Sequence, residues 1–372
     1  MKSPSPASRR GFLAGAVAAP ALLNAQTGSK RIRVAYIGVG NRGSYTMGHT
    51  MNVEGVEIAA ICDINPEALK KGGAAAEAKG NKPRLYEDYR KMIEEMKDVD
   101  AIVIATPTKA HLPMTLAALE AGKHVYCEKP MGFDERECDV IEKAARSAKG
   151  IYQCGFQLRH HPARNAAVKF VLNGGIGRVL YLQGYRHTSD LPKFIPWLFD
   201  RDVSGDNIVE QACHILDLFV WAIGKPPLRA MGSGGINLYK NDPPGRTVMD
   251  NYSVIYEFPD DIRVTFSHIY FDPPGFSGIK ERVYGSAGAI DLPTATWKRL
   301  GEKEPIELQV ENKTGNADFL SMQAFIENAR SGKRPLNDAA SAKLSTMVGI
   351  LGRKAIHEKR IVTWQELAGT SA

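Results

Sequence analysis

The sequence of 372 residues lacks several features that would mark a specialised class of protein. Its five cysteines are scattered and include no Cys-x-x-Cys pair, which argues against a cysteine zinc site and a disulfide framework. It has no run of five like charges and no basic stripe interleaved with aromatic residues, so no nucleic-acid partner is expected. No internal repeat is present, and no apolar stretch reaches the ~20 residues that a transmembrane helix needs.

What remains is the composition of an ordinary globular protein, with 44% hydrophobic and 24% charged residues. At ~100–200 residues per domain, the length predicts two or three domains. The net charge is +7, and three of the positive charges (Lys2, Arg9 and Arg10) lie in the first 25 residues, which contain no acidic residue.

Those 25 residues have the order of a signal peptide. Arg9 and Arg10 precede an apolar stretch over residues 12–23, which ends near Ala25. The paired arginines resemble the bacterial twin-arginine export signal, whose route carries folded proteins. They predict a cleaved signal over residues 1–25, a partner in the twin-arginine export machinery, a periplasmic or otherwise extracytoplasmic location and no membrane span after processing. The alternative is an uncleaved N-terminal extension.

Strand and helix patterns alternate over residues 31–150. Short apolar runs predict strands at 31–38, 56–62, 98–105 and 124–127, and periodic segments predict helices at 66–79, 111–121 and 135–147. This alternation is typical of a doubly wound parallel sheet, and so of a Rossmann domain over 31–150.

The second half, residues 151–372, has a different pattern. Strands are predicted at 179–187, 251–258, 262–270 and 281–285, and helices at 206–223, 318–331 and 339–357. With few helices between the strands, the pattern favours an α+β domain with a mostly antiparallel, open sheet. We therefore predict an α/β first domain followed by an α+β second domain.

A dinucleotide-binding fingerprint, Gly38-Val39-Gly40-Asn41-Arg42-Gly43, follows the first predicted strand. Glycines there allow a tight turn and a close approach of the backbone to a pyrophosphate at a helix N-terminus. Asp63 ends the next strand, 20 positions after Gly43, where a carboxylate would bind ribose hydroxyls and repel a 2′-phosphate. NAD is therefore favoured over NADP, although Arg42 is a nearby positive charge. The alternative is a glycine-rich turn that binds no ligand.

Two further motifs carry a resemblance to a known family. Ala105-Thr106-Pro107 is followed by His111, and Ala121-Gly122-Lys123-His124-Val125 leads into Glu128-Lys129-Pro130. Together with the fingerprint, these motifs resemble the Gfo/Idh/MocA family, which includes glucose–fructose oxidoreductase and inositol dehydrogenase, over roughly residues 31–360. The resemblance implies that Lys129 lies between the nicotinamide and the substrate. There it would bond the reacting hydroxyl, with a pKa lowered by burial and by the nicotinamide charge.

A second constellation lies in the predicted helix at 206–223. Glu210, His214 and Asp217 are spaced to share one face of that helix. The family usually has Asp-x-x-x-His here, so Glu210 replaces the aspartate, and His214 is implied as the general base. Glu210 would orient it or bind a second hydroxyl, and Asp217 would hold one imidazole tautomer. The alternatives are a histidine packed between domains and satisfied by Asp217, or a metal site, which lacks a third ligand and is not predicted.

The resemblance extends these assignments to two sets of residues. The catalytic residues would be Lys129, His214 and Glu210. The cofactor-binding set is Gly38, Gly40, Asn41, Arg42, Gly43, Asp63, Thr106, Pro107, His111, Glu128, Lys129 and Gln157. The substrate-binding set is Lys129, Arg159, Glu210, His214 and Asp217.

Two reactions and one role without catalysis are compatible with the resemblance. The first is hydride transfer between tightly held NAD and a hydroxyl of a small carbohydrate, a sugar, cyclitol or glycoside. The second is an NAD-dependent glycoside hydrolase that oxidises a hydroxyl transiently, eliminates, hydrates and reduces again. The third is binding of NAD without catalysis. The resemblance also implies that the second domain, residues 151–372, binds substrate and forms the contacts of a homodimer or homotetramer.

Overall fold

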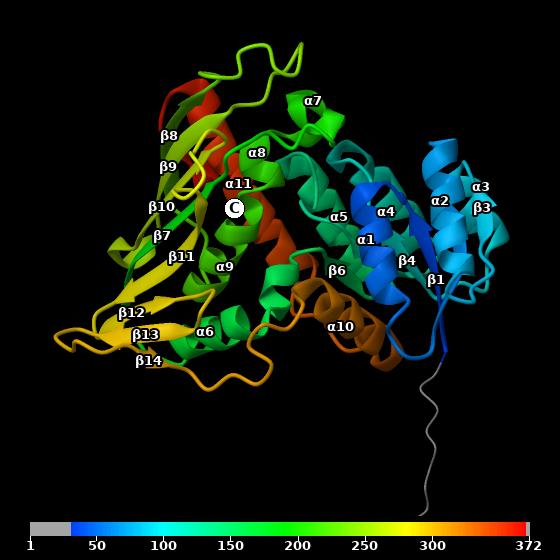
Figure 1. Cartoon of the computed structure of the whole chain (residues 1–372), viewed down its shortest axis with the longest axis horizontal. Helices are drawn as coiled ribbons and strands as arrows, with labels where there is room; N and C mark the ends of the chain where they lie inside the picture. The colour runs from blue at the N-terminus through cyan, green and yellow to red at the C-terminus, as the bar shows by residue number, and fades with distance from the viewer. Residues whose placement is uncertain (1–30, 370–372) are drawn as a thin grey trace, which may run out of the picture.

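A computed structural model describes residues 31–369, so the predicted signal peptide at residues 1–25 lies outside the described residues. The first domain is built on a six-stranded parallel sheet in the order β3-β2-β1-β4-β5-β6 (Figure 1). Its strands are β1 (Ile32–Ile37), β2 (Val56–Cys62), β3 (Arg84–Tyr86), β4 (Ala101–Ile104), β5 (His124–Cys127) and β6 (Tyr152–Cys154). The strand order reverses between β1 and β4, which is where such sheets open a ligand crevice.

Helices cover both faces of this sheet, which explains why its central strands are mostly apolar. All four residues of β4 are buried, as expected when neither face meets water. The helices are α1 (Asn41–Thr50), α2 (Pro66–Glu77), α3 (Tyr89–Glu95), α4 (His111–Glu120) and α5 (Glu135–Ser147). The predicted doubly wound parallel sheet is thus confirmed, and β6 extends it beyond residue 150.

The second domain contains a nine-stranded sheet in the order β14-β13-β12-β11-β7-β10-β9-β8-β15. Every pairing in it is antiparallel except that of β7 with β10. Its strands are β7 (Val179–His187), β8 (Arg229–Gly235), β9 (Asn251–Glu257), β10 (Arg263–Ile269), β11 (Gly278–Gly285), β12 (Gly288–Asp291), β13 (Thr296–Arg299), β14 (Ile306–Glu307) and β15 (Val362–Thr363). The prediction of a mostly antiparallel sheet is confirmed.

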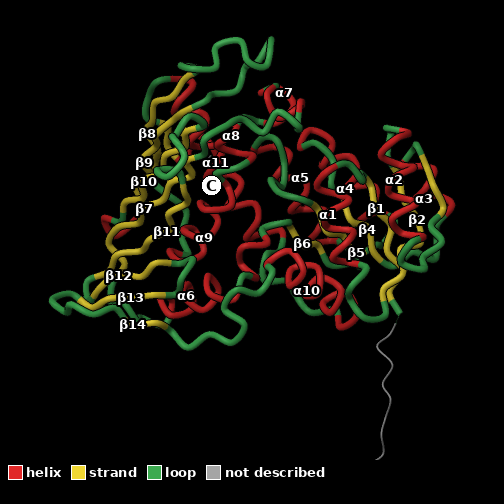
Figure 2. Tube along the Cα trace, in the orientation of Figure 1, coloured by secondary structure: helices red, strands yellow, loops and turns green. Residues whose placement is uncertain are grey.

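The second half of the chain forms helices α6 (Pro162–Leu172), α7 (Arg201–Ser204), α8 (Asn207–Glu210), α9 (Cys213–Ile223), α10 (Ala317–Ser331), α11 (Ala339–Glu358) and α12 (Trp364–Ala368). Of these, α9 and α11 lie between the nine-stranded sheet and the first domain (Figure 2). Helix α10 returns to the first domain, where Phe325 packs against Tyr126 of β5. None of the helices within residues 31–369 is long and apolar enough to cross a membrane.

The predicted continuous helix at 206–223 is wrong, because the structure divides it into α8 and α9. Gln211 has φ −112° and ψ −44°, so the regular helix stops after Glu210 and starts again at Cys213. Glu210 and His214 consequently do not share one helix face. The break leaves the Glu210 carbonyl outside a continuous helical ladder, where it accepts a hydrogen bond from Lys129.

Candidate active site

A cavity of about 800 Å³ lies between the two domains. The first domain contributes the turns that follow β1, β2, β4 and β5, all at the carboxyl edge of the parallel sheet. The second contributes side chains from α6, β7, α8, α9 and β11. The cavity therefore occupies the place where an open α/β sheet binds its ligand, and the second domain closes it.

The glycine turn after β1 has the geometry of a phosphate cradle. Gly38 has φ +87°, and a Cβ there would lie 2.6 Å from the Ala105 carbonyl oxygen. A Cβ on Gly43 would lie 2.0 Å from the Gly38 oxygen, so α1 packs this closely only because residue 43 is glycine. Gly40 faces open space and caps α1 without a side-chain bond, which leaves N–H groups of the first turn free for an anion.

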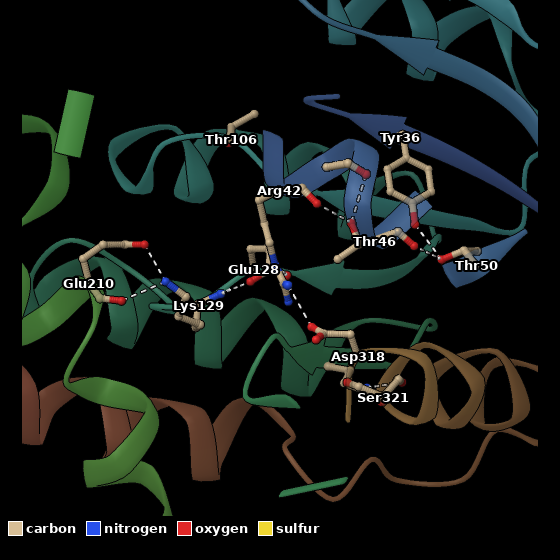
Figure 3. Close-up of polar contacts among 12 residues, drawn as sticks. Tyr36, Arg42, Thr46, Thr50, Thr106, Glu128, Lys129, Glu210, Asp318 and Ser321 are labelled. Atoms are coloured by element: carbon tan, nitrogen blue, oxygen red, sulfur yellow. Dashed lines mark hydrogen bonds and ion pairs between the residues drawn. The ribbon is translucent and has the colours of Figure 1, made fainter. Parts of the chain in front are cut away.

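Asp63 stands beside this turn, where ribose hydroxyls would lie. One carboxylate oxygen accepts a hydrogen bond from Val39 N (2.8 Å) and the other from Asn65 N (2.9 Å), and the residue lines the cavity. Arg42 contacts two other carboxylates, Glu128 at 2.7 Å and Asp318 at 2.8 Å, in the first domain and on α10 (Figure 3). The two carboxylates already balance the charge of Arg42, so Arg42 gives no preference for the 2′-phosphate of NADP. The residues present therefore fit NAD.

Lys129 follows β5 and reaches across to the second domain (Figure 3). Its Nζ donates to Glu210 Oε1 at 2.5 Å and to the Glu210 carbonyl oxygen at 2.8 Å. The peptide bond from Lys129 to Pro130 is cis. Of the three ammonium N–H groups, one remains for a ligand in the cavity.

The structure corrects the expected pKa of Lys129. Burial lowers this pKa, but the carboxylates, foremost Glu210, more than offset burial and leave it raised. The Lys129 ammonium is therefore a hydrogen-bond donor at neutral pH. The second oxygen of Glu210 accepts from the Thr108 hydroxyl at 3.0 Å, which fixes the carboxylate that holds Lys129.

His214, at the start of α9, lines the same cavity. Its pKa lies well below the usual range, because burial disfavours the imidazolium and Lys129 and Arg42 add repulsion. Its Nδ1 is buried without a hydrogen-bond partner among the described residues. Neither Asp217 nor Glu210 bonds this ring, so the predicted holding of its tautomer by Asp217 is wrong. His214 is a neutral imidazole that can accept a proton.

Arg159 and Asp217 do not line the cavity but pair with each other, so their predicted contact with substrate is wrong. The Arg159 guanidinium donates to both oxygens of Asp217, at 2.6 to 3.1 Å. Ser345 of α11 donates to the same carboxylate at 2.7 Å, and the Leu336 carbonyl accepts from Arg159 at 3.1 Å. Both side chains are almost fully buried, so the pair connects three helical segments within the core.

His111 likewise departs from its predicted role in holding the cofactor, because it is 1% exposed and lies behind the cavity wall. Its two ring nitrogens lie 2.8 Å from the Pro130 carbonyl oxygen and 3.0 Å from that of Thr106. Carbonyls only accept, so both bonds require a ring with two protons. Burial opposes that charge, but Cys127, the Pro130 carbonyl and Glu210 raise the pKa to about 9. His111 thereby ties together the two turns that carry Thr106 and Lys129.

Comparison with known proteins agrees with this geometry. A sequence model described as "Oxidoreductase family, NAD-binding Rossmann fold" matches residues 32–156, and the "GFO/IDH/MocA C-terminal domain" matches residues 165–291. Together the two cover more than half of the chain. The chain belongs to the Gfo/Idh/MocA family. Its first domain is the family's NAD-binding domain, and its second is the family's C-terminal domain.

Individual Gfo/Idh/MocA relatives are distant. The chain is 24% identical to a myo-inositol 2-dehydrogenase of Thermotoga maritima, over 91% of this chain and all of the relative. A crystal structure of myo-inositol 2-dehydrogenase from Lactobacillus plantarum shares 26% identity and a TM-score of 0.75, with 90% and 99% of the two chains covered. A glycosyl hydrolase family 109 protein of Shewanella pealeana is 37% identical, but over only 32% of this chain and 27% of its own length.

The sequence analysis did not identify the charged side chains that the second domain contributes to the cavity. Arg164 of α6 and Glu281 of β11 form an ion pair of 2.7 Å in the cavity wall, and Arg186 of β7 lines the same cavity. Gln211 accepts from the Tyr270 hydroxyl at 2.7 Å and also lines the cavity, as does Trp197. The sequence does carry a signal for two of these residues. Arg186 and Glu281 are charged residues at positions where the alternation of a strand pattern predicts a buried side chain.

The predicted residues Thr106, Pro107, Glu128 and Gln157 all line the cavity, together with the glycine turn. Within residues 31–369, no three His, Cys, Asp or Glu side chains gather closely enough to hold a metal ion.

Proposed function

We propose that the protein transfers a hydride between NAD and a hydroxyl-bearing carbon of a carbohydrate, a sugar or a cyclitol. The observation that carries this proposal is the meeting of Lys129 and His214 in one cavity with the glycine turn and Asp63. Two of the relatives named above are inositol dehydrogenases, which supports a polyhydroxylated substrate. Bound NAD would supply the hydride acceptor, and the protein's own residues would bind, orient and deprotonate the hydroxyl.

The two central side chains have complementary properties. The free N–H of the Lys129 ammonium donates to the reacting hydroxyl and stabilises the negative charge that develops on its oxygen. The neutral imidazole of His214 accepts the proton that leaves this oxygen. Glu210 keeps Lys129 charged and in place through its carboxylate and its carbonyl. The protein thus separates the donor role of a cation from the acceptor role of a neutral base.

This assignment predicts an unusual pH dependence. An ordinary histidine would be half protonated near pH 6.5, whereas the pKa of His214 is held well below its usual range. Since the neutral form is the base, we expect kcat/KM for hydroxyl oxidation to stay nearly level from about pH 8 down to about pH 6. A pH–rate profile of the purified enzyme checks this. A loss of rate with a midpoint near 6.5 would contradict the assignment.

Asp63 is the second residue whose replacement tests the proposal. We expect Asp63→Ala to weaken NAD binding about 10-fold or more and to reduce the preference for NAD over NADP. The reason is that the variant lacks the carboxylate that would bond the ribose hydroxyls and repel a 2′-phosphate. Titrations of both dinucleotides by fluorescence measure the effect. Glu87→Ala, which also removes a carboxylate from the cavity wall, is the control. An unchanged ratio of the two affinities would exclude the ribose contact.

We further propose that the protein is exported by its twin-arginine segment with NAD already bound and retained. Outside the cytoplasm no free nicotinamide pool is expected, so a cofactor that is reduced and reoxidised in place would sustain turnover. The test is mass spectrometry of small molecules released on denaturing the processed protein. NAD released in about one copy per chain supports retention, and protein that is free of nucleotide after purification contradicts it.

Incubation of the same holoprotein with sugars, cyclitols and aryl glycosides tests the reaction. Lasting reduction of NAD by a free sugar or cyclitol, reversed by a second carbonyl compound, is the expected result. Release of the aglycone without lasting reduction of NAD would instead establish the glycosidase. The short match to the glycosyl hydrolase family 109 protein is the observation that supports this alternative. If neither lasting reduction of NAD nor release of an aglycone is observed, the proposed function is wrong.

A further inference from the structure

Arg186 is a cation in the wall of the cavity that forms no ion pair with any of the described residues, 31–369. It lies on β7, in register with Ile279 of β11 and with His268 of β10. Alternation along β7 places it on the same face as Leu182 and Gly184, which is the face that packs against α9. Its side chain lines the cavity in the second domain, and its charge contributes to the lowered pKa of His214.

Every other cation in the cavity wall is paired. Lys129 is matched by Glu210, Arg42 by Glu128 and Asp318, and Arg164 by Glu281. Arg186, by contrast, makes no side-chain hydrogen bond or ion pair with any residue from 31 to 369. Its Nε is buried and lacks a hydrogen-bond acceptor. Buried donors are nearly always satisfied, so this guanidinium lacks its partner in the protein alone.

The cofactor does not supply that partner. The pyrophosphate cradle is formed by Gly38 to Gly43 after β1 in the first domain, whereas Arg186 projects from the sheet of the second domain. Arg186 acts instead on His214, the proton acceptor of the proposed reaction, and lies beside Ile279 of the cavity wall. The missing anion therefore belongs to the substrate end of the cavity.

We propose that the substrate is a sugar acid whose carboxylate binds Arg186. This inference rests on the proposed hydride transfer and names its substrate class. A carboxylate matches the planar fork of a guanidinium with two parallel hydrogen bonds, and a single negative charge balances the single unmatched cation. A neutral sugar would bury the same guanidinium without neutralising it, at a cost in affinity. The enzyme should thus distinguish a uronate from the aldose of otherwise identical structure.

The experiment compares glucuronate with glucose, which differ only at C6, and galacturonate with galactose. The holoenzyme is assayed for reduction of NAD by each, with glucose 6-phosphate included as a dianion. We expect the uronates to have the higher kcat/KM, and Arg186→Gln to lower the uronate-to-aldose ratio about 10- to 100-fold. Arg186→Lys, which keeps the charge but not the fork, should give an intermediate ratio. Arg178→Gln makes the same charge change at an exposed site just before β7 and serves as the matched control.

Two results would overturn the proposal. The first is a higher kcat/KM for the aldoses or for glucose 6-phosphate than for the uronates. The second is a uronate-to-aldose ratio that is unchanged in Arg186→Gln. If none of these compounds reduces NAD, the proposed function is in doubt, and calorimetric titration of glucuronate then tests the anion site directly. Binding by the unsubstituted protein that is lost in Arg186→Gln and kept in Arg178→Gln supports the site. No binding by the unsubstituted protein overturns it.

Discussion

Replacing Lys129 by methionine is expected to lower kcat by about 10²- to 10⁴-fold. Methionine keeps the length and removes the ammonium, so the side chain no longer stabilises the oxygen as it loses its proton. NAD binding should change little, because the glycine turn and Asp63, which would hold the pyrophosphate and the ribose, are unchanged. The replacement also leaves Glu210 without its ion-pair partner, although its other oxygen still accepts from Thr108.

Two measurements separate these effects. Fluorescence titration gives the affinity for NAD, and single-turnover kinetics gives the rate of hydride transfer. Lys109→Met, an exposed lysine that borders the Thr108 turn, is the matched control and should retain its rate. A Lys129→Met enzyme that binds NAD and keeps more than a tenth of the normal rate would show that Lys129 has no central role.

The local sequence predicted much of the fold, because near-neighbour patterns determine it. Strands β2 (Val56–Cys62), β5 (His124–Cys127) and β7 (Val179–His187) have the predicted boundaries. Short runs rich in apolar residues identify such strands without reference to distant residues. The same holds for the glycine turn and Asp63, since their spacing within a βα unit is a local property. The short strands β13 (Thr296–Arg299) and β14 (Ile306–Glu307) carried too little pattern to be predicted.

The site was less predictable because its contacts join distant segments. Lys129 and Glu210 are 81 positions apart, and Arg164 and Glu281 are 117 apart. The break at Gln211 has no local signal such as proline or glycine, so spacing alone suggested one helix for Glu210 and His214. Similarity to a motif likewise placed Arg159 and His111 at the ligand, whereas the structure uses both to hold segments together behind the cavity wall.

Replacing Asp217 by leucine is expected to lower the free energy of unfolding by about 3–5 kcal/mol. Leucine fills most of the space but leaves the Arg159 guanidinium, with a side chain only 4% exposed, without its counter-charge. Ser345 also loses its acceptor. Arg159→Met should be about as destabilising, because it strands the Asp217 carboxylate. The double variant should recover part of the loss, since it removes both buried charges together.

Urea denaturation of the four proteins gives these free energies, and steady-state kinetics at low temperature gives KM for the folded enzymes. If Arg159 and Asp217 serve only to join η2 (Gln157–His160), α9 and α11, then KM stays within about threefold of normal while stability falls. If either residue contacts substrate, its replacement raises KM far more than the double-variant cycle of stabilities accounts for. Since both residues are buried, are bonded to other core groups and do not line the cavity, we expect the first result. The buried pair would then differ clearly in role from the unmatched charge of Arg186.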